Sequence, residues 1–193
     1  MKKIALSLFI LVCIGFTSNA QSENSTNVRR ERIGFSFIGN DFATAERIRT
    51  TSYATVLREE RVAKLKEMGH GFALHYFRGF TPNIDLAATF GGSFVRFALP
   101  GRTINSNRFL AEIDASANFK MFSRATFNPY LIAGIGASKY TNVFGAFIPV
   151  GGGVNINLFN ELDLFSQLQY RIPVTPDANK HHFQVSFGIA SNL

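Results

Sequence analysis

Apolar and polar residues alternate through most of this chain of 193 residues. The alternation is unbroken in the last segment, where Phe183, Val185, Phe187 and Ile189 are separated by polar or small residues. A period of two residues is typical of a β-strand with one apolar and one polar face. The segments that show this period are 33–39, 71–79, 84–97, 109–122, 128–141, 147–159, 161–174 and 182–190. The sequence therefore predicts an all-β protein of eight strands.

The lengths of the segments and of their connections favour a barrel that crosses a membrane. Several segments reach the roughly 9 to 11 residues that a tilted strand needs to cross a bilayer. The connections 81–83, 123–127 and 159–161 are tight, 40–70 and 100–107 are longer, and 142–146 and 175–180 are intermediate. Short periplasmic turns and longer outward loops are typical of outer-membrane barrels. We therefore expect an antiparallel up-and-down transmembrane barrel.

The polar face differs from the face that a soluble barrel presents to water. It holds mainly Asn, Gln, Ser, Thr and Gly, which suit the interior of a narrow barrel. We therefore expect the polar face to line the lumen and the apolar face to meet lipid. The residues expected to point outward are Ile113, Ala115, Ala117, Phe119, Val154, Ile156, Phe183, Val185 and Phe187. Inward packing of these residues would favour the alternative, a soluble secreted lipocalin-like barrel that binds a small apolar ligand.

The first twenty residues have the pattern of a secretory signal peptide. Two lysines precede an apolar run over 4–16, and small residues end the segment at 18–20. The run is too short for a membrane-spanning helix, which needs roughly 20 residues. Cys13 follows a valine inside this run, so a lipid anchor is not expected. We predict a signal peptide over 1–20, a periplasmic N-terminal segment over 21–30 and the barrel domain over 31–193.

Cleavage of this segment would lower the net charge from +7 to +5, because 18 bases would remain with 13 acids. The bases are spread along the chain, whereas nucleic-acid binding needs a clustered basic patch. No nucleic acid is therefore expected as a partner. The mature chain would contain no cysteine, so its stability must come from burial or from a closed hydrogen-bond network.

Charged residues on the predicted inner face are candidates for ion pairs in the lumen. Because the strands run alternately up and down, Glu112 falls at the height of Arg171. Lys120 falls at the height of Asp85 or Asp163. Lone buried charges are costly, so we expect these residues to pair and to plug the lumen with isolated water; an open channel is the alternative. Further polar residues expected in the lumen are Asp114, Asn118, Asn155, Asn157, Gln167, Gln169, His182 and Gln184.

The histidines do not form a recognisable catalytic pattern; they are His70, His75, His181 and His182. A lipid A deacylase barrel would need a His, a Ser and an acid on its outer wall, but His182 and Ser186 fall on the predicted inner face. Glycines at 134–136 and 151–153 lack the Lys and the helix of a phosphate loop. We expect these glycines to allow close packing in a narrow barrel. The sequence thus predicts no enzyme, no cofactor and no metal site.

Segment 41–69 lacks the alternation of a strand. Apolar residues recur there at helical spacing, between a possible cap at Thr51 or Ser52 and a possible stop at Gly69. These apolar residues are Leu57, Val62, Leu65 and Met68. We expect a short amphipathic helix in the first outward loop. It would either touch lipopolysaccharide or a partner, or cover the barrel mouth as a solvated flap.

Several stretches resemble the barrel domain of OmpA-like outer-membrane proteins. They are the signal, the alternating segments, NPYLIAGIGASKY, PVGGGVNINLFNELDLFSQLQYR and the terminal FQVSFGIA. The resemblance covers residues 31 to 190 and rests on residue classes. It implies a structural or anchoring barrel in the outer membrane of a Gram-negative-type bacterium, reached through the periplasm. It also implies contacts with outer-membrane lipid, lipopolysaccharide and the barrel insertion machinery.

The end of the chain departs from that family in one respect. A barrel of this kind usually ends at an aromatic residue that the insertion machinery reads, whereas this sequence continues from Phe187 to Leu193. The departure indicates either reliance on Phe187 or a barrel cut from a longer protein. In the family, the barrel is often followed by a domain that grips peptidoglycan, so this chain could be the membrane domain of such a protein.

Overall fold

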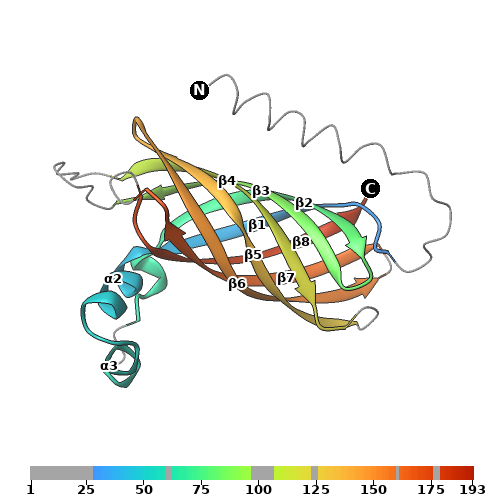
Figure 1. Ribbon diagram of the computed structural model, residues 1–193, viewed down its shortest axis with the longest axis horizontal. Coiled ribbons are helices and arrows are strands. Elements are labelled where there is room, and N and C mark those ends of the chain that lie inside the picture. Colours follow the sequence, from blue (N-terminus) through green and yellow to red (C-terminus); the bar gives the residue numbers. More distant parts are fainter. Residues whose placement is uncertain (1–27, 60–61, 97–106, 123–125, 160, 176–178) are drawn as a thin grey trace.

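The strands close into one antiparallel barrel (Figure 1). The computed structural model describes residues 28–59, 62–96, 107–122, 126–159, 161–175 and 179–193. The strands are β1 (Arg32–Asp41), β2 (Gly69–Thr81), β3 (Ile84–Val95), β4 (Arg108–Lys120), β5 (Phe127–Tyr140), β6 (Val143–Phe159), β7 (Leu162–Pro173) and β8 (His182–Asn192). Each strand pairs with its neighbours in the sequence, and β1 pairs with β8. The predicted eight-stranded up-and-down barrel is confirmed.

The alternation in the sequence separates the two faces of each strand. Along β4, Glu112, Asp114 and Asn118 are buried, whereas Ile113 and Phe119 are 56% and 45% exposed. Since a slip of one residue would exchange the two faces, the pattern fixes the pairing register. All the residues predicted to point outward lie on the outer face, where they are exposed or half-exposed. That prediction is confirmed.

Large apolar side chains cover the outside of the barrel on every strand. Examples in strand order are Phe35, Phe72, Phe90, Ile113, Ile135, Ile148, Leu168 and Phe187. Soluble monomers rarely expose contiguous apolar patches larger than a few hundred Å². We refer to this outer apolar surface as the apolar belt. It is the reverse of a soluble barrel, in which such side chains fill the interior.

The connection between β5 and β6 is shorter than predicted. A loop over 142–146 was expected, but β6 begins at Val143, which pairs with Tyr140. Only Thr141 and Asn142 join the two strands, and Thr141 has a φ of 59°. Positive φ is typical of two-residue hairpin turns, whose twist matches that of the strands. The outward connections are therefore not all longer than the inner ones. The predicted alternation of short and longer connections is wrong at this hairpin.

Two of the glycines approach the neighbouring strand very closely. A Cβ at Gly151 would lie 2.1 Å from the carbonyl oxygen of Leu168, and a Cβ at Gly134 would lie 2.3 Å from that of Ala115. Separations this short would force the strands apart. Close packing, and not phosphate binding, thus explains these glycines.

The first outward loop contains two short helices, α2 (Phe42–Thr50) and α3 (Tyr53–Arg58), and one 3₁₀ turn, η1 (Leu65–Glu67). Helix α3 begins at the predicted cap Ser52, whose hydroxyl accepts a hydrogen bond from the backbone N–H of Thr55 at 3.2 Å. Helix α2 was not predicted; the Asp41 carboxylate caps it by accepting from the N–H of Thr44 at 2.8 Å. Among the described residues, no helix is both long and apolar enough to span a membrane.

The predicted helix is wrong in its extent, because α3 ends well before Gly69, which belongs to β2. A tertiary contact explains the early end: the N–H of Ala63 donates to the hydroxyl of Thr44 at 2.8 Å, which ties this segment back onto α2. The expected apolar face is also wrong, since Leu57 and Leu65 are exposed and Val56 is buried instead.

Candidate functional site: the charged lumen

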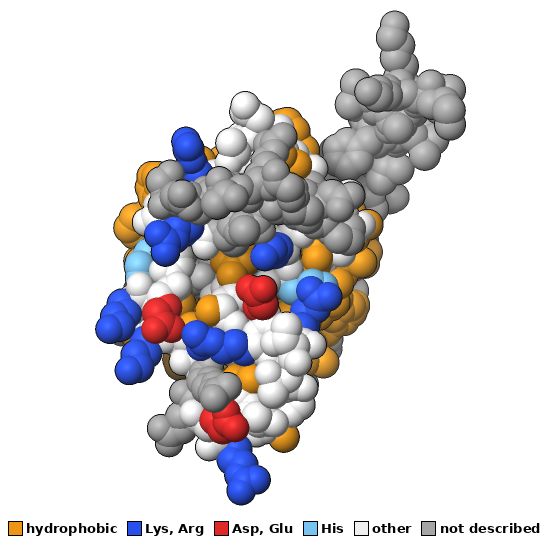
Figure 2. All heavy atoms as spheres, turned by 90° about the vertical axis from the view of Figure 1, so that its left-hand side faces the viewer, with side chains coloured by type: hydrophobic (Ala, Val, Ile, Leu, Met, Phe, Trp, Pro, Cys, Tyr) orange, Lys and Arg blue, Asp and Glu red, His pale blue; other side chains and the backbone are white. Residues whose placement is uncertain are grey.

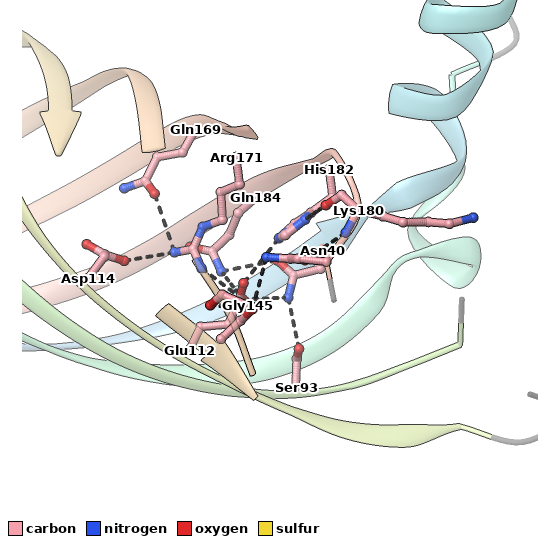
Figure 3. A network of polar contacts seen from close by, with 12 residues as sticks. Asn40, Ser93, Glu112, Asp114, Gly145, Gln169, Arg171, Lys180, His182 and Gln184 are labelled. Atoms are coloured by element: carbon pink, nitrogen blue, oxygen red, sulfur yellow. Dashed lines mark hydrogen bonds and ion pairs between the residues drawn. The ribbon is translucent and has the colours of Figure 1, made fainter. Parts of the chain in front are cut away.

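The outer half of the lumen contains a network centred on Arg171 of β7 (Figure 3). Its Nη1 lies 2.8 Å from Glu112 Oε2, and its Nη2 donates to Asp114 Oδ2 at 3.0 Å. The same Nη2 donates to Gln184 Oε1 at 2.5 Å. The Arg171 guanidinium also lies 4.6 Å from the centre of the Phe147 ring. One cation therefore faces two carboxylates in a site that is almost fully buried.

Neighbouring polar side chains extend this network toward the outer mouth (Figure 3). His182 Nε2 lies 3.4 Å from Glu112 Oε1, and its Nδ1 lies 2.9 Å from the carbonyl oxygen of Lys180. Asn40 Nδ2 donates to Ser93 Oγ at 2.8 Å, and its Oδ1 accepts from Gln184 at 3.1 Å. The network thus joins β1, β3, β4, β7 and β8 across the lumen.

The inner half of the lumen contains a second network, in which bases and acids alternate. Lys120 Nζ donates to Asp85 Oδ1 at 2.7 Å, and Arg32 Nη2 donates to Asp85 Oδ2 at 3.2 Å. The other end of the Arg32 guanidinium donates to Asp163. Arg29 Nη1 lies 3.6 Å from the same Asp163 carboxylate. Arg32 therefore bridges two acids that come from β3 and β7.

Uncharged hydrogen bonds occupy the lumen between the two networks. His75 Nε2 lies 2.7 Å from Ser36 Oγ, and His75 Nδ1 lies 3.2 Å from Thr89 Oγ1. Gln167 donates to the hydroxyl of Tyr130 at 2.9 Å and accepts from Gln169 at 3.3 Å. These groups are all buried, so their polar atoms depend on one another for hydrogen bonds.

Apolar clusters close off parts of the lumen. Near the outer mouth, Val95, Leu110 and Tyr140 form a buried cluster, and Phe42 of α2 packs against it. The Phe42 ring also stacks on His182, with the ring centres 4.3 Å apart. We refer to these residues as the outer cap. Nearer the inner mouth, a second cluster comprises Phe77, Ala87, Phe165 and Ala190.

The structure brings most of the predicted lumen residues together. Glu112 meets Arg171, and Lys120 meets Asp85 and not Asp163, the other partner considered. Asp163 pairs with arginines and accepts from Asn157 at 2.9 Å and Asn155 at 3.5 Å. Asn118 is buried beside the lower network, in the lining of a cavity of about 10 Å³.

Sequence reasoning missed several lumen residues, and Arg32 is the most consequential. The predicted first strand began at Ile33, so the preceding residue, Arg32, was left out. Because Ile33 is 50% exposed, the period of two places Arg32 in the lumen. The same rule would have found Ser36, His75 and Thr89. It would also have placed Phe165, which is 2% exposed, inside the barrel.

Charged side chains at the outer end of the barrel are mainly basic. Figure 2 views this end and shows Lys and Arg around much of the visible face, with fewer acids. We refer to the described bases here as the outer rim: Arg47, Arg49, Arg58, Lys64, Lys66, Arg96, Arg108, Lys139 and Lys180. The exposed acids described here are Glu46, Glu59 and Glu67. At the inner end, exposed Arg30 and Arg78 are balanced by Glu31 and Glu161.

Within the described residues, no cluster of three or more His, Cys, Asp or Glu side chains is placed to hold a metal ion. Within the two networks, each of the acids Asp85, Glu112, Asp114 and Asp163 lies beside a base. Their chemistry is thus that of mutual neutralisation across the barrel.

A closed antiparallel barrel of eight strands, polar inside and apolar outside, has the fold of the small outer-membrane β-barrels. One similar structure is Ail, the attachment invasion locus protein of Yersinia pestis, at 13% identity and a TM-score of 0.50, over 85% of this chain and 97% of that one. Neisserial surface protein A is similar at 14% identity and a TM-score of 0.50, over 84% and 96%. The outer-membrane enzyme PagL aligns at 9% identity and a TM-score of 0.49, over 84% and 99%. No protein-family model and no curated protein matches the sequence.

Proposed function

We propose that this protein is a structural or anchoring barrel of a Gram-negative outer membrane, with a lumen that blocks ion flow. The observation that carries the proposal is the reversed distribution of side chains: buried ion pairs inside and the apolar belt outside. Lipid is the solvent in which such an outer surface is stable. The fold shared with Ail and Neisserial surface protein A supports the same location.

Four groups of side chains fill the lumen and support a plug. They are the outer cap, the Arg171 network, the Phe77 cluster and the charges around Arg32. The 10 Å³ cavity, lined by the Phe77 cluster and the lower network, is large enough for about one water. Asn118 Oδ1 and Asn155 Oδ1 have no hydrogen-bond partner among the described residues, so a water there would satisfy them.

A soluble lipocalin-like carrier is not favoured. Such a barrel holds its ligand in an apolar interior, whereas paired charges and amides fill this lumen. A catalytic role is also not proposed, because the Ser36 and His75 side chains that lie together are 1% and 3% exposed and face away from lipid. Joined to a periplasmic domain that grips peptidoglycan, the same barrel would serve as its membrane anchor.

Membrane insertion should be visible as heat modifiability on a gel. We expect the protein to require detergent for extraction and to migrate faster unboiled than boiled, because the closed barrel stays compact until heat opens its strand pairing. The measurement is semi-native electrophoresis of membrane and soluble fractions. A protein that is soluble without detergent would contradict the proposed location.

Conductance across a planar bilayer tests the plug. We expect the parent protein to be silent and Arg171→Gln to leak, because this substitution leaves two buried carboxylates without their cation and draws water into the lumen. Glu112→Gln should leak less, because Arg171 keeps its contact with Asp114. Glu31→Gln is the matched control, since Glu31 pairs with Arg78 in an exposed ion pair. Steady large conductance in the parent, unchanged by either lumen substitution, would refute the plug.

A further inference from the structure

A pocket at the outer end lies between α2 and the start of β8. Phe42, Glu46, Arg49 and Thr50 line it from α2, and Lys180 and His181 line it from the opposite side. Its volume is about 240 Å³. Most of the lining side chains are polar or charged, and Phe42 adds an aromatic ring. No step of the proposed barrel function uses this pocket.

The charge of the pocket is positive. Arg49 and Lys180 contribute two cations, and Glu46 contributes one acid. Within the described part of the chain, neither Arg49 nor Lys180 forms an ion pair. Burial, and then the charges of Arg49 and His182, lower the pKa of His181. The two cations therefore remain available to an anionic group.

The position of the pocket selects among anionic ligands. His181 Nδ1 lies 2.9 Å from the hydroxyl of Tyr170, and the Tyr170 ring packs against Phe183 with the centres 4.9 Å apart. Further down the same strands, Leu168 and Val185 belong to the apolar belt. Aromatic residues with polar tips are enriched where a membrane meets water. The pocket thus adjoins the level at which the phosphates of outer-leaflet lipids lie.

We propose that this pocket binds the phosphate group of a lipid in the outer leaflet, with Arg49 and Lys180 as the charged contacts and His181 beside them. The inference rests on the proposed function, since it requires the apolar belt to be in a membrane. Charge-assisted hydrogen bonds from Arg and Lys are the usual protein contacts to phosphate. The acyl chains of the lipid would continue along Tyr170 and Phe183 onto the apolar belt.

The titration of His181 provides a direct readout. A bound phosphate stabilises the protonated imidazole, so occupancy raises the pKa of His181. Arg49, His182 and the hydroxyl of Tyr170 are the groups that face this ring. The experiment follows the ring by NMR in zwitterionic detergent micelles, with the signal assigned from His181→Gln, while dioctanoyl phosphatidic acid is added. Inorganic phosphate at equal concentration is the second arm.

Two double variants distinguish binding in the pocket from attraction by the positive charge of the whole outer rim. In Arg49→Gln/Lys180→Gln we expect the affinity for phosphatidic acid to fall at least about tenfold, because two charge-assisted hydrogen bonds are lost. In Arg108→Gln/Lys139→Gln, which removes equal charge from the rim outside the pocket, we expect a change of no more than about twofold. Lipid-bound and lipid-free titrations are compared within each variant, since loss of Arg49 alone raises the pKa of His181.

Each outcome decides the inference. A saturable rise in the pKa of His181 with phosphatidic acid, weakened only in Arg49→Gln/Lys180→Gln, supports the site. If both pairs of substitutions weakened the affinity equally, the effect would come from the charge of the whole rim. If inorganic phosphate raised the pKa of His181 equally, lipid would not be the source, and if that pKa showed no saturable rise, no site would exist. Each of these three results would overturn the proposal. A parent protein that is heat-modifiable but fails these tests loses only this inference, whereas one that is not heat-modifiable loses the proposed function.

Discussion

Replacing Arg171 by Met is expected to lower the free energy of unfolding by about 3–5 kcal/mol, the usual cost of removing one partner from a buried ion pair. Arg171 is 1% exposed, and its substitution leaves Glu112 and Asp114 facing each other without a cation. Methionine keeps an unbranched apolar stem but ends before the guanidinium that lies over Phe147, so the loss combines the missing charge with that contact. Urea unfolding of the barrel reconstituted in lipid vesicles measures the change.

Two controls isolate the electrostatic origin of that loss. Adding Glu112→Gln and Asp114→Asn to the Arg171→Met variant should recover most of the stability, because neutral amides need no cation. Arg78→Met removes a pair that is half-exposed, with side chains 49% and 48% accessible, and should cost no more than about 1 kcal/mol. Equal losses for Arg171→Met and Arg78→Met would contradict the buried network.

Introducing a charge into the apolar belt should have the second large effect. Ile135 is 69% exposed in the middle of β5, and Ile135→Arg is expected to lower the free energy of unfolding in bilayers by about 2–4 kcal/mol. The reason is that the guanidinium would have to leave water for hydrocarbon. Vesicle unfolding and the yield of folded protein both measure the loss.

Leu65 provides a matched control for this substitution. It is 71% exposed, close to the value for Ile135, but it lies in the 3₁₀ turn of the first outward loop. Leu65→Arg should therefore change the stability by no more than about 0.5 kcal/mol, as is usual for a surface residue in water. If Ile135→Arg were equally mild, the outer face would be in water and the membrane assignment would fail.

The period of two was sufficient to predict both the barrel and the opposition of Glu112 to Arg171. Each strand reverses direction, so a residue's distance from its strand end sets its height in the lumen, and the parity of its position sets its face. The same reasoning left Asp85 and Asp163 as possible partners of Lys120, but it could not choose between them. Lys120 pairs with Asp85, and Arg32, which the predicted strand omitted, bridges Asp85 to Asp163.

Other features depend on contacts that no local pattern contains. Leu110 and Tyr140 point inward although most of the inner face is polar, because Phe42 from the loop covers them and completes an apolar cluster. Helix α2 exists through its cap at Asp41 and its packing over β8. The pocket at Arg49 and Lys180 arises only when α2 lies beside the start of β8. Sequence spacing alone does not bring these segments together.

The contact between Arg32 and Asp163 joins residues 131 positions apart, and this separation bears on how the chain folds. Arg32 stands on the first strand to be synthesised, whereas its partner arrives with the seventh, and the first strand finds its second neighbour only in the last. Contacts of such long range make folding slow, since most of the chain must be ordered before they form. Until closure, β1 and β8 are free edges and Asp163 lacks the strand-borne cation that neutralises it. The pairing of β1 with β8 and the formation of the Arg32–Asp163 ion pair therefore occur together. The last step of folding is thus expected to be all-or-none.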